Sequence, residues 1–281
     1  MRGGHQQKTW LAALAIATTG AGLQAKPAFA EFQIQEAGIE KGETELEYRG
    51  AYHWGVPEAT NVNENANDIV QSHEAEISYG VTNWWLVQIT TGFEQPLGES
   101  LQISDVEFES ELALIKRHGD GFAVSFQAGY EQAINHGDGE GDPNQIGFGP
   151  IVELATGKLL LTLNPIFTKQ VGKFSNQEGL GFDYGWRAEY DFAPRWGAGV
   201  EMFGGIESLA NAGSFNDQVH SLGPTLFSNP AAEEEGDEAR GDDDKVAGPA
   251  KMALSLNVGA QVGLTDATSD AALKFQGSVA F

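Results

Sequence analysis

Apolar and polar residues alternate at a spacing of two from residue 43 to the end of the chain. In the last nine residues the apolar face carries Leu273, Phe275, Val279 and Phe281, and the residues between them are mainly polar. A period of two belongs to β-strands, because successive side chains of a strand point to opposite sides. The alternation therefore predicts an all-β protein whose strands have one apolar and one polar face.

Twelve segments carry this alternation and are separated by turn residues. They cover residues 43–53, 69–79, 84–94, 101–115, 122–132, 146–154, 159–167, 179–192, 196–207, 219–227, 251–262 and 271–281. The connections between them alternate in length, and the short ones are 80–83, 116–121, 156–158 and 193–195. An even number of strands of about 9–11 residues, with long loops at one end, is typical of a membrane barrel. We predict a single transmembrane antiparallel up-and-down β-barrel over residues 43–281.

The first 30 residues have the features of a cleaved secretion signal. A basic start is followed by an apolar run, and an Ala-Phe-Ala sequence at 28–30 supplies the cleavage pattern. A buried N-terminal helix is the alternative. We expect residues 1–30 to be removed on export, and residues 31–42 to form a short periplasmic segment before the barrel. The destination is then the outer membrane of a Gram-negative bacterium, reached through the periplasm.

Composition excludes several classes of protein. The mean hydropathy is −0.28, and no run of about 18 apolar residues occurs beyond the signal, which excludes a helical membrane protein. A membrane barrel stays compatible, because lipid-facing and lumen-facing residues alternate and cancel. The net charge of −24 excludes nucleic acid as a partner, because phosphate contacts need Lys and Arg. The chain has no cysteine and so uses no disulfides.

If the apolar faces meet lipid, the polar faces point into the barrel. The candidate lumen-lining residues are Glu43, Glu45, Glu47, Arg49, Glu74, Glu76, Glu107, Glu109, Glu111, Glu131, Asp183, Arg187, Glu189 and Glu201. So many carboxylates beside two arginines cannot be buried dry, so the interior holds water or a charge network with bound cations. An acidic, wet lumen favours cations. Two states remain open: an open channel, and a barrel filled by its own side chains or by an N-terminal segment.

The final strand resembles the closing strand of bacterial outer-membrane barrels. That resemblance implies that Phe275, Val279 and Phe281 belong to an insertion signal for the barrel-insertion machinery. The start of the predicted barrel at 36–47, the Tyr-Gly-Val-Thr-Asn-Trp-Trp turn at 79–85 and Gly-Leu-Thr-Asp at 263–266 are similar to proteobacterial barrels of the "MetA-pathway of phenol degradation" type. This resemblance implies an outer-membrane channel or transporter.

One segment departs both from the loop pattern and from what is expected of the barrels that the chain resembles. Residues 228–250 fall where a short turn is expected, yet they are long and rich in Asp and Glu. Their low hydrophobicity and dense charge predict a disordered acidic insertion. A miscounted strand nearby is the alternative.

Motifs for catalysis and metal binding are weak. A Gly-x-Ser-x-Gly sequence is absent. The loop at 138–144 begins like a calcium loop, but Gly149 stands where the bidentate acid is needed. The histidines outside the signal have no metal-ligand spacing; they are His53, His73, His118, His136 and His220. We therefore expect no enzyme, no cofactor and no metal site.

Three hypotheses for function follow from these observations. The first is a channel or transporter for small solutes, with outer-membrane lipid as surroundings and small solutes or cations as cargo. The second is a closed structural or adhesion barrel without transport. The third is a barrel lipid hydrolase or protease, which requires a Ser/His/Asp or Asp/His set at the barrel rim.

Overall fold

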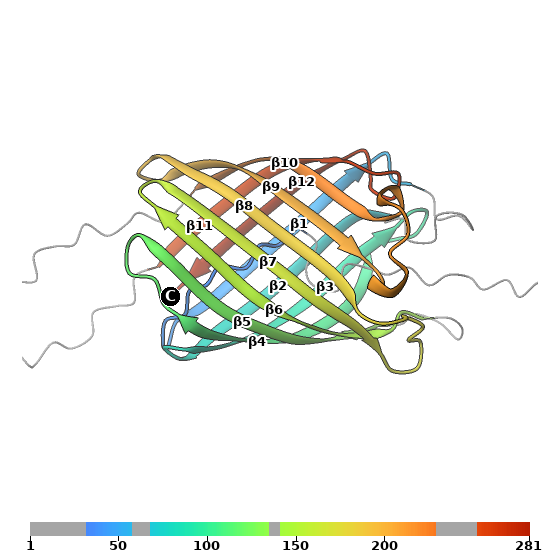
Figure 1. Ribbon diagram of the computed structural model, residues 1–281, viewed down its shortest axis with the longest axis horizontal. Helices are drawn as coiled ribbons and strands as arrows, with labels where there is room; N and C mark the ends of the chain where they lie inside the picture. Colours follow the sequence, from blue (N-terminus) through green and yellow to red (C-terminus); the bar gives the residue numbers. More distant parts are fainter. Residues whose placement is uncertain (1–31, 58–67, 135–140, 229–251) are drawn as a thin grey trace, which may run out of the picture.

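The computed structural model describes residues 32–57, 68–134, 141–228 and 252–281. The expected signal peptide at 1–30 and nearly all of the acidic segment at 228–250 lie outside these residues. In the described residues the chain forms twelve antiparallel strands that tilt around a common axis (Figure 1).

The strands follow one another along the chain. They are β1 (Thr44–Trp54), β2 (Ile69–Thr82), β3 (Trp85–Pro96), β4 (Gln102–Ile115), β5 (Gly121–Ala133), β6 (Asn144–Thr156), β7 (Leu159–Val171), β8 (Gly181–Ala193), β9 (Trp196–Ile206), β10 (Val219–Ser228), β11 (Ala253–Gly263) and β12 (Ala271–Ala280). The loop between β9 and β10 contains two short 3-10 helices, η1 (Leu209–Asn211) and η2 (Phe215–Asp217). No helix in the described parts of the chain is long and apolar enough to cross a membrane.

The sheet closes on itself, because β1 pairs with β12 as well as with β2. In this seam Arg49 lies opposite Gln276. The predicted single up-and-down barrel is therefore confirmed. β10 and β11 also pair antiparallel, from Ser221 with Gly263 to Ser228 with Leu256. The strand count on both sides of the acidic segment is thus correct, and a miscounted strand does not explain that segment.

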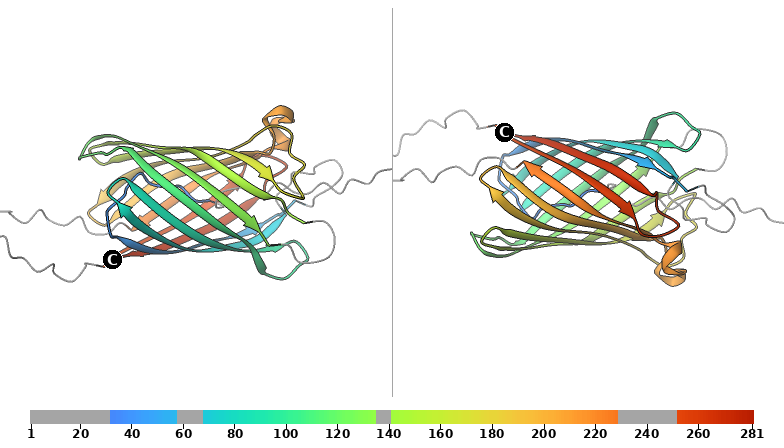
Figure 2. Two further views of the ribbon diagram at one scale, coloured as in Figure 1. Left: turned by 90° about the horizontal axis from the view of Figure 1, so that it is seen from below. Right: turned by 90° about the horizontal axis from the view of Figure 1, so that it is seen from above.

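The two ends of the barrel differ in their connections. The turns after β2, β4, β6 and β8 are short and lie at the end that also holds the C-terminus, while most connections at the opposite end are longer (Figure 2). Gly157 makes one short turn with a φ of +60°, a conformation that glycine adopts without strain. Its amide donates to Oδ1 of Asp120 in the neighbouring turn, at 2.9 Å. This asymmetry is the one that the sequence predicts.

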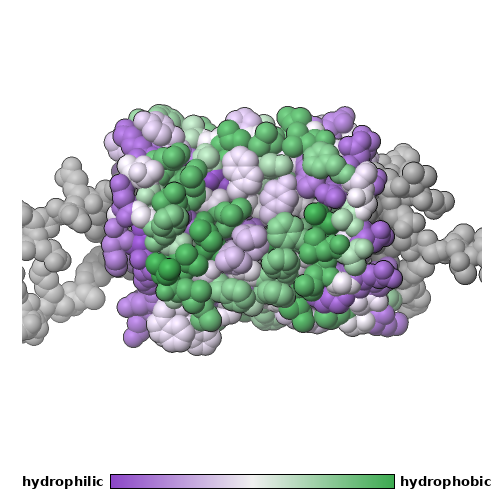
Figure 3. Space-filling view, viewed as in Figure 1, coloured by the Kyte–Doolittle hydropathy of each residue, from purple (hydrophilic) through white to green (hydrophobic). Residues whose placement is uncertain are grey.

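The barrel has an apolar outer face and a polar inner face. On β11 the outward side chains of Leu254, Leu256 and Val258 are 50–55% exposed, whereas inward Arg49 and Glu201 are nearly fully buried. On the face that Figure 3 shows, apolar residues cover the middle of the outer surface, with hydrophilic residues at both ends. An exposed apolar surface of this size would drive aggregation in water, and it matches the hydrocarbon core of a bilayer. The fold defines a membrane-spanning β-barrel of the outer-membrane type.

The segment before the barrel corrects one expectation. Residues 32–42 were expected as part of a short periplasmic segment, but residues 32–39 run inside the barrel, where Ile34 and Ile39 are 6% and 3% exposed, and residues 40–42 are exposed at its short-turn rim. The segment enters the lumen from the short-turn end, where Gly42 donates its amide to the carbonyl of Gly80 at 2.7 Å. The physical reason is that the lumen offers partners for an extended backbone, as described next. We call residues 32–42 the N-terminal segment.

Candidate functional site

The N-terminal segment is held mainly through its backbone. On β7 the side-chain amide of Asn164 contacts both backbone groups of Gln35. The Gln35 amide donates to Asn164 Oδ1 at 2.6 Å, and Asn164 Nδ2 donates to the Gln35 carbonyl at 3.1 Å. Asn164 thus makes the hydrogen bonds that a neighbouring strand would otherwise make with this backbone. Buried backbone N–H and C=O groups inside the barrel require such partners.

The same type of contact, from wall side chain to segment backbone, recurs at other levels. The pairs are Lys274 Nζ to the Phe32 carbonyl at 3.2 Å, the Ala37 amide to Glu153 Oε1 at 3.0 Å, Lys116 Nζ to the Ile39 carbonyl at 2.8 Å, and the Lys41 amide to Asn83 Oδ1 at 3.2 Å. The partners come from different strands and turns around the ring. The segment is therefore fixed along its length.

Apolar contacts add to this attachment. The ring of Phe32 stacks on His53 with centroids 5.6 Å apart and meets Phe203 edge-on at 5.2 Å. Ile34 lies over Gly185, where an added Cβ would come within 3.2 Å of the Ile34 side chain. The glycine leaves the room that the segment needs on the β8 wall.

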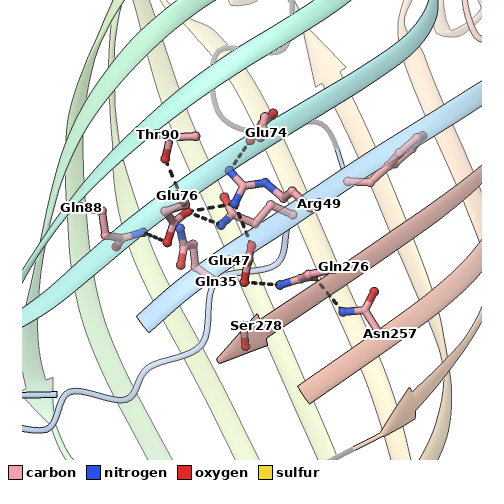
Figure 4. Close-up of polar contacts among 12 residues, drawn as sticks. Gln35, Glu47, Arg49, Glu74, Glu76, Gln88, Thr90, Asn257, Gln276 and Ser278 are labelled. Atoms are coloured by element: carbon pink, nitrogen blue, oxygen red, sulfur yellow. Dashed lines mark hydrogen bonds and ion pairs between the residues drawn. The ribbon is translucent and has the colours of Figure 1, made fainter. Parts of the chain in front are cut away.

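One wall of the lumen carries a charge cluster centred on Arg49 (Figure 4). Arg49 Nη1 pairs with Glu47 at 2.7 Å and with Glu76 at 2.8 Å, and Nη2 pairs with Glu74. Gln276 donates to Glu47 at 2.6 Å, and further polar contacts come from Gln88 to Glu76 and from Asn257 to Gln276. All partners of this guanidinium belong to β1 and β2. We call Arg49 with Glu47, Glu74 and Glu76 the Arg49 cluster.

A second cluster lies on another part of the ring and includes the N-terminal segment. Arg187 on β8 pairs with Glu36 through Nη2 and with Glu189 through Nε at 3.4 Å. Its guanidinium also lies 5.0 Å from the ring centre of Phe227. The Arg187 side chain is 5% exposed and that of Glu36 is 59% exposed, so the carboxylate borders lumen space. We call Arg187 with Glu36 and Glu189 the Arg187 cluster.

The remaining buried charges differ in how they are compensated. Lys274 Nζ pairs with Glu201 at 2.6 Å, and Thr225 donates to the same carboxylate at 2.6 Å. On β4, Glu107 and Glu111 are 5% and 3% exposed, and each has an Oε1 without a hydrogen-bond partner among the described groups. Buried carboxyl oxygens in this position need water, a cation or a proton.

The fourteen predicted lumen residues thus occupy defined places. Those on β1, β2, β4, β5, β8 and β9 fall on the inward positions of their strands, Glu131 opposite Glu107 and Asp183 opposite Gly205. Glu43 differs, because it precedes β1 and lies at the short-turn rim, where its amide donates to the Glu40 carbonyl at 3.3 Å.

Sequence reasoning missed several lumen residues. They are Glu36, Lys116, Glu153, Asn164 and Lys274. Three of these residues lie on polar positions of strands that the alternation predicted: Lys274, Glu153 and Asn164. The alternation of polar and apolar positions alone could therefore have identified them as lumen residues. Glu36 and Lys116 lie outside the strands and carry no such signal.

Two carboxyl groups next to the strands are perturbed in opposite directions. Arg187 lowers the pKa of Glu36, with Arg117 adding to the effect against the opposing desolvation of the carboxyl. Desolvation raises the pKa of Glu43, and the nearby charge of Glu40 raises it further. The pairing of Glu36 with Arg187 therefore persists to lower pH than an ordinary glutamate pair.

Space remains beside the N-terminal segment. A cavity of about 670 Å³ is lined by the segment itself, by Glu45, Glu47 and Glu76 on one side, and by Arg187 on the other. Pockets that bind small molecules commonly measure about 300–1,000 Å³. The lumen is thus narrowed by the segment but still contains room for a small solute.

The histidines that the structure describes form no cluster for chemistry. His73 and His220 lie on outward positions, and each accepts or donates a hydrogen bond with a tyrosine hydroxyl, Tyr48 at 3.0 Å and Tyr184 at 2.9 Å. Within the described residues no group of three or more His, Cys, Asp or Glu is arranged to hold a metal ion.

One serine–histidine contact occurs near the long-loop end. His53 Nδ1 lies 2.8 Å from Ser269 Oγ, but the two residues are 5% and 4% exposed, and Phe32 stacks over the imidazole. A nucleophile in this position has no open approach for a lipid or a peptide bond.

No family model matches this chain, and no curated protein matches it. Among solved structures it is similar to the KdgM porin, with 10% identity, a TM-score of 0.48 and coverage of 84% of this chain and 98% of the porin. It is also similar to Omp33 of Acinetobacter baumannii, with 12% identity, a TM-score of 0.39 and coverage of 86% and 98%. A third is OprD of Pseudomonas aeruginosa, with 11% identity, a TM-score of 0.38 and coverage of 85% and 66%. None of these likenesses bears on the cargo of this chain.

Proposed function

We propose that this protein is an outer-membrane channel for small solutes, with an acidic lumen that favours cations and an N-terminal segment that narrows the lumen in the closed state. The observation that carries the proposal is the charged interior. Arg49, Arg187 and Lys274 each pair with carboxylates, while Glu107 and Glu111 keep oxygens without a described partner. A purely structural barrel can fill its interior with apolar or neutral side chains at lower desolvation cost.

The excess of carboxylates supports selectivity for cations. The β4 acids line one wall, and the cavity beside the N-terminal segment is bordered by further acids on β1 and β2. A narrow pore with walls of one charge sign concentrates counter-ions and repels ions of the same sign. We therefore expect potassium to pass more readily than chloride.

Conductance in planar lipid bilayers tests the proposal. The mature chain, reconstituted alone, should give rare and small openings at neutral pH, and a salt gradient should give a reversal potential of the sign for cation selectivity. The matched variant Glu109→Gln removes one carboxyl group from the β4 wall and should shift that potential toward zero without abolishing current. Silence of the wild type and of variants with a loosened N-terminal segment would contradict a channel function.

A closed structural barrel is the second candidate. The backbone contacts of Asn164, Glu153 and Lys116 with the N-terminal segment favour it, because they attach the segment at several levels. A structural barrel should stay silent even when these contacts are removed. A hydrolytic function has less support, because Ser269 and His53 are buried under Phe32.

Family membership and assembly partners also remain proposals. Phe275 and Val279 of the last strand, and Phe281 directly after it, fall at outward positions and fit the proposed insertion signal. Truncating Phe281 should reduce insertion into the outer membrane in living cells. The similarity to the "MetA-pathway of phenol degradation" barrels stays a prediction from short sequence pieces.

A further inference from the structure

The cavity beside the N-terminal segment has two sides of opposite charge. β1 and β2 contribute Glu45, Glu47 and Glu76, whereas Arg187 comes from β8, on a distant part of the ring. Arg49 already compensates Glu47 and Glu76, but three acids of its cluster share that single guanidinium. A ligand in this cavity meets surplus negative charge on one side and a buried arginine on the other.

The N-terminal segment itself places complementary groups on both sides. The side-chain amide of Gln33 donates to Glu76 Oε2 at 3.3 Å, and the carboxylate of Glu36 pairs with Arg187. These two positions are three residues apart, so extended backbone between them spans at most about 10 Å. The segment therefore carries a hydrogen-bond donor to the acidic side and a carboxylate to the basic side.

We propose that Arg187 is the carboxylate subsite of a binding site for small zwitterions, such as amino acids or short peptides, and that the N-terminal segment occupies this site in the closed state. The ammonium group of the ligand binds on the acidic side, at Glu76 and Glu45. This inference rests on the proposed function only in that the lumen must be open to water. A planar guanidinium that is fixed by burial and by Glu189 binds a carboxylate in bidentate fashion.

Glu36 is suited to be a replaceable occupant of this site. Its side chain is 59% exposed, so a competing carboxylate can approach Arg187 from the cavity. Other contacts of the segment, such as Asn164 with Gln35, use the backbone and do not depend on Glu36. Replacing the carboxylate of Glu36 by an amide should therefore free the subsite while most of the segment's other partners remain.

Isothermal titration calorimetry on the detergent-purified mature protein tests the inference without requiring conductance. The probes are 6-aminohexanoate, hexanoate and hexylamine, which share a chain and differ in their charged ends. Glu36→Gln should bind 6-aminohexanoate at least about tenfold more tightly than the wild type does, because the competing carboxylate is gone. Glu178→Gln, in the exposed loop between β7 and β8 and outside the lining of the cavity, is the matched control and should behave as the wild type.

Three further variants in the Glu36→Gln background assign the two ends of the ligand. Arg187→Gln should abolish binding of 6-aminohexanoate and of hexanoate, and Arg187→Lys should weaken both while retaining a folded barrel. Glu76→Gln should remove the preference for 6-aminohexanoate over hexanoate. Folding of each variant is checked by the gel shift between heated and unheated samples.

The outcomes separate this inference from the channel function. Equal binding by Glu36→Gln, Glu178→Gln and the wild type would overturn the subsite, as would binding that is unchanged by Arg187→Lys. Binding with the expected pattern in a protein that never conducts would leave the subsite standing and refute the channel. Conductance without such binding would do the reverse.

Discussion

The Arg49 cluster and the Arg187 cluster contain the same chemistry but differ in where the acids come from. Arg49 is held by Glu47, Glu74 and Glu76, which are all on barrel strands. Arg187 takes Glu189 from its own strand and Glu36 from the N-terminal segment. The first cluster joins neighbouring strands of the wall, and the second joins the wall to a piece of chain that does not belong to the sheet.

This difference separates the charges that stabilise the barrel wall from the charges that hold the N-terminal segment in the lumen. Breaking the Arg49 cluster leaves buried carboxylates that cannot move away, because their strands are fixed by the hydrogen-bond ladder. Breaking the Arg187 cluster leaves Glu36 free to enter water, because its side chain already faces the cavity. We expect stability effects from the first and gating effects from the second.

The largest expected effect is the loss of Arg49. Arg49→Met should destabilise the folded barrel by about 3–5 kcal/mol, the range for removing one partner of a buried charge pair. Arg187→Met should destabilise the folded barrel clearly less than Arg49→Met does, because Glu36 can be released into water. Urea unfolding in lipid vesicles, followed by tryptophan fluorescence, measures both. Equal losses for the two variants would remove the distinction between the clusters.

The next effect concerns opening of the lumen. Glu36→Gln should increase the fraction of time in conducting states several-fold in planar bilayers, because it weakens a charge-assisted contact. Glu47→Gln, the corresponding change in the Arg49 cluster, should leave the channel as closed as the wild type, since Glu74 and Glu76 still hold the arginine. Similar opening by both variants would show that the source of the acid does not matter.

Acid should act through the same contact. The pKa of Glu36 is lowered below its ordinary value of 4.5, so the pairing with Arg187 is complete above that value and is lost as the pH falls through the lowered pKa. We expect wild-type conductance to rise below pH 4.5 and the Glu36→Gln variant to lack this step. Asp217→Asn is the control, because Ser214 lowers the pKa of Asp217 in a loop away from the segment. An identical acid step in wild type and Glu36→Gln would count against the account.

The smallest effect is expected at Asn164. Asn164→Leu removes the two hydrogen bonds to the Gln35 backbone, each of which contributes about 0.5–1.5 kcal/mol. Hydrogen exchange at the Gln35 amide should accelerate, while the ladder amides of β7 keep their protection. Exchange at Gln35 that is as slow as in the wild type would show that Asn164 does not hold the segment.

The sequence predicted the barrel well because the patterns that specify it lie within single strands and turns. A strand between lipid and water must alternate apolar and polar residues, so this alternation alone placed Glu109, Arg187 and Glu201 on the inner face. The short turns likewise follow from local signals such as Gly157. Even the uncertain region around 228–250 had the correct strands on both sides.

The position of the N-terminal segment could not be predicted in the same way. Its contacts pair Gln35 with Asn164 and Glu36 with Arg187, which are more than 100 residues apart in the chain, and no periodic pattern links them. The sequence allowed a lumen filled by an N-terminal segment as one alternative. It did not indicate which residues of that segment would contact which residues of the wall. Whether a residue such as Glu36 projects into a lumen depends on the closed ring as a whole.

A disulfide between the N-terminal segment and the wall tests the central claim most directly. An added Cβ at Gly185 would lie 3.2 Å from Cγ1 of Ile34, which suits a disulfide between Ile34→Cys and Gly185→Cys, and the chain has no other cysteine. In the Glu36→Gln background, the oxidised protein should be silent in planar bilayers, and reduction should restore the conductance of Glu36→Gln. Conductance that is equal in the oxidised and reduced protein would contradict the claim that residues 32–42 occupy and close the lumen.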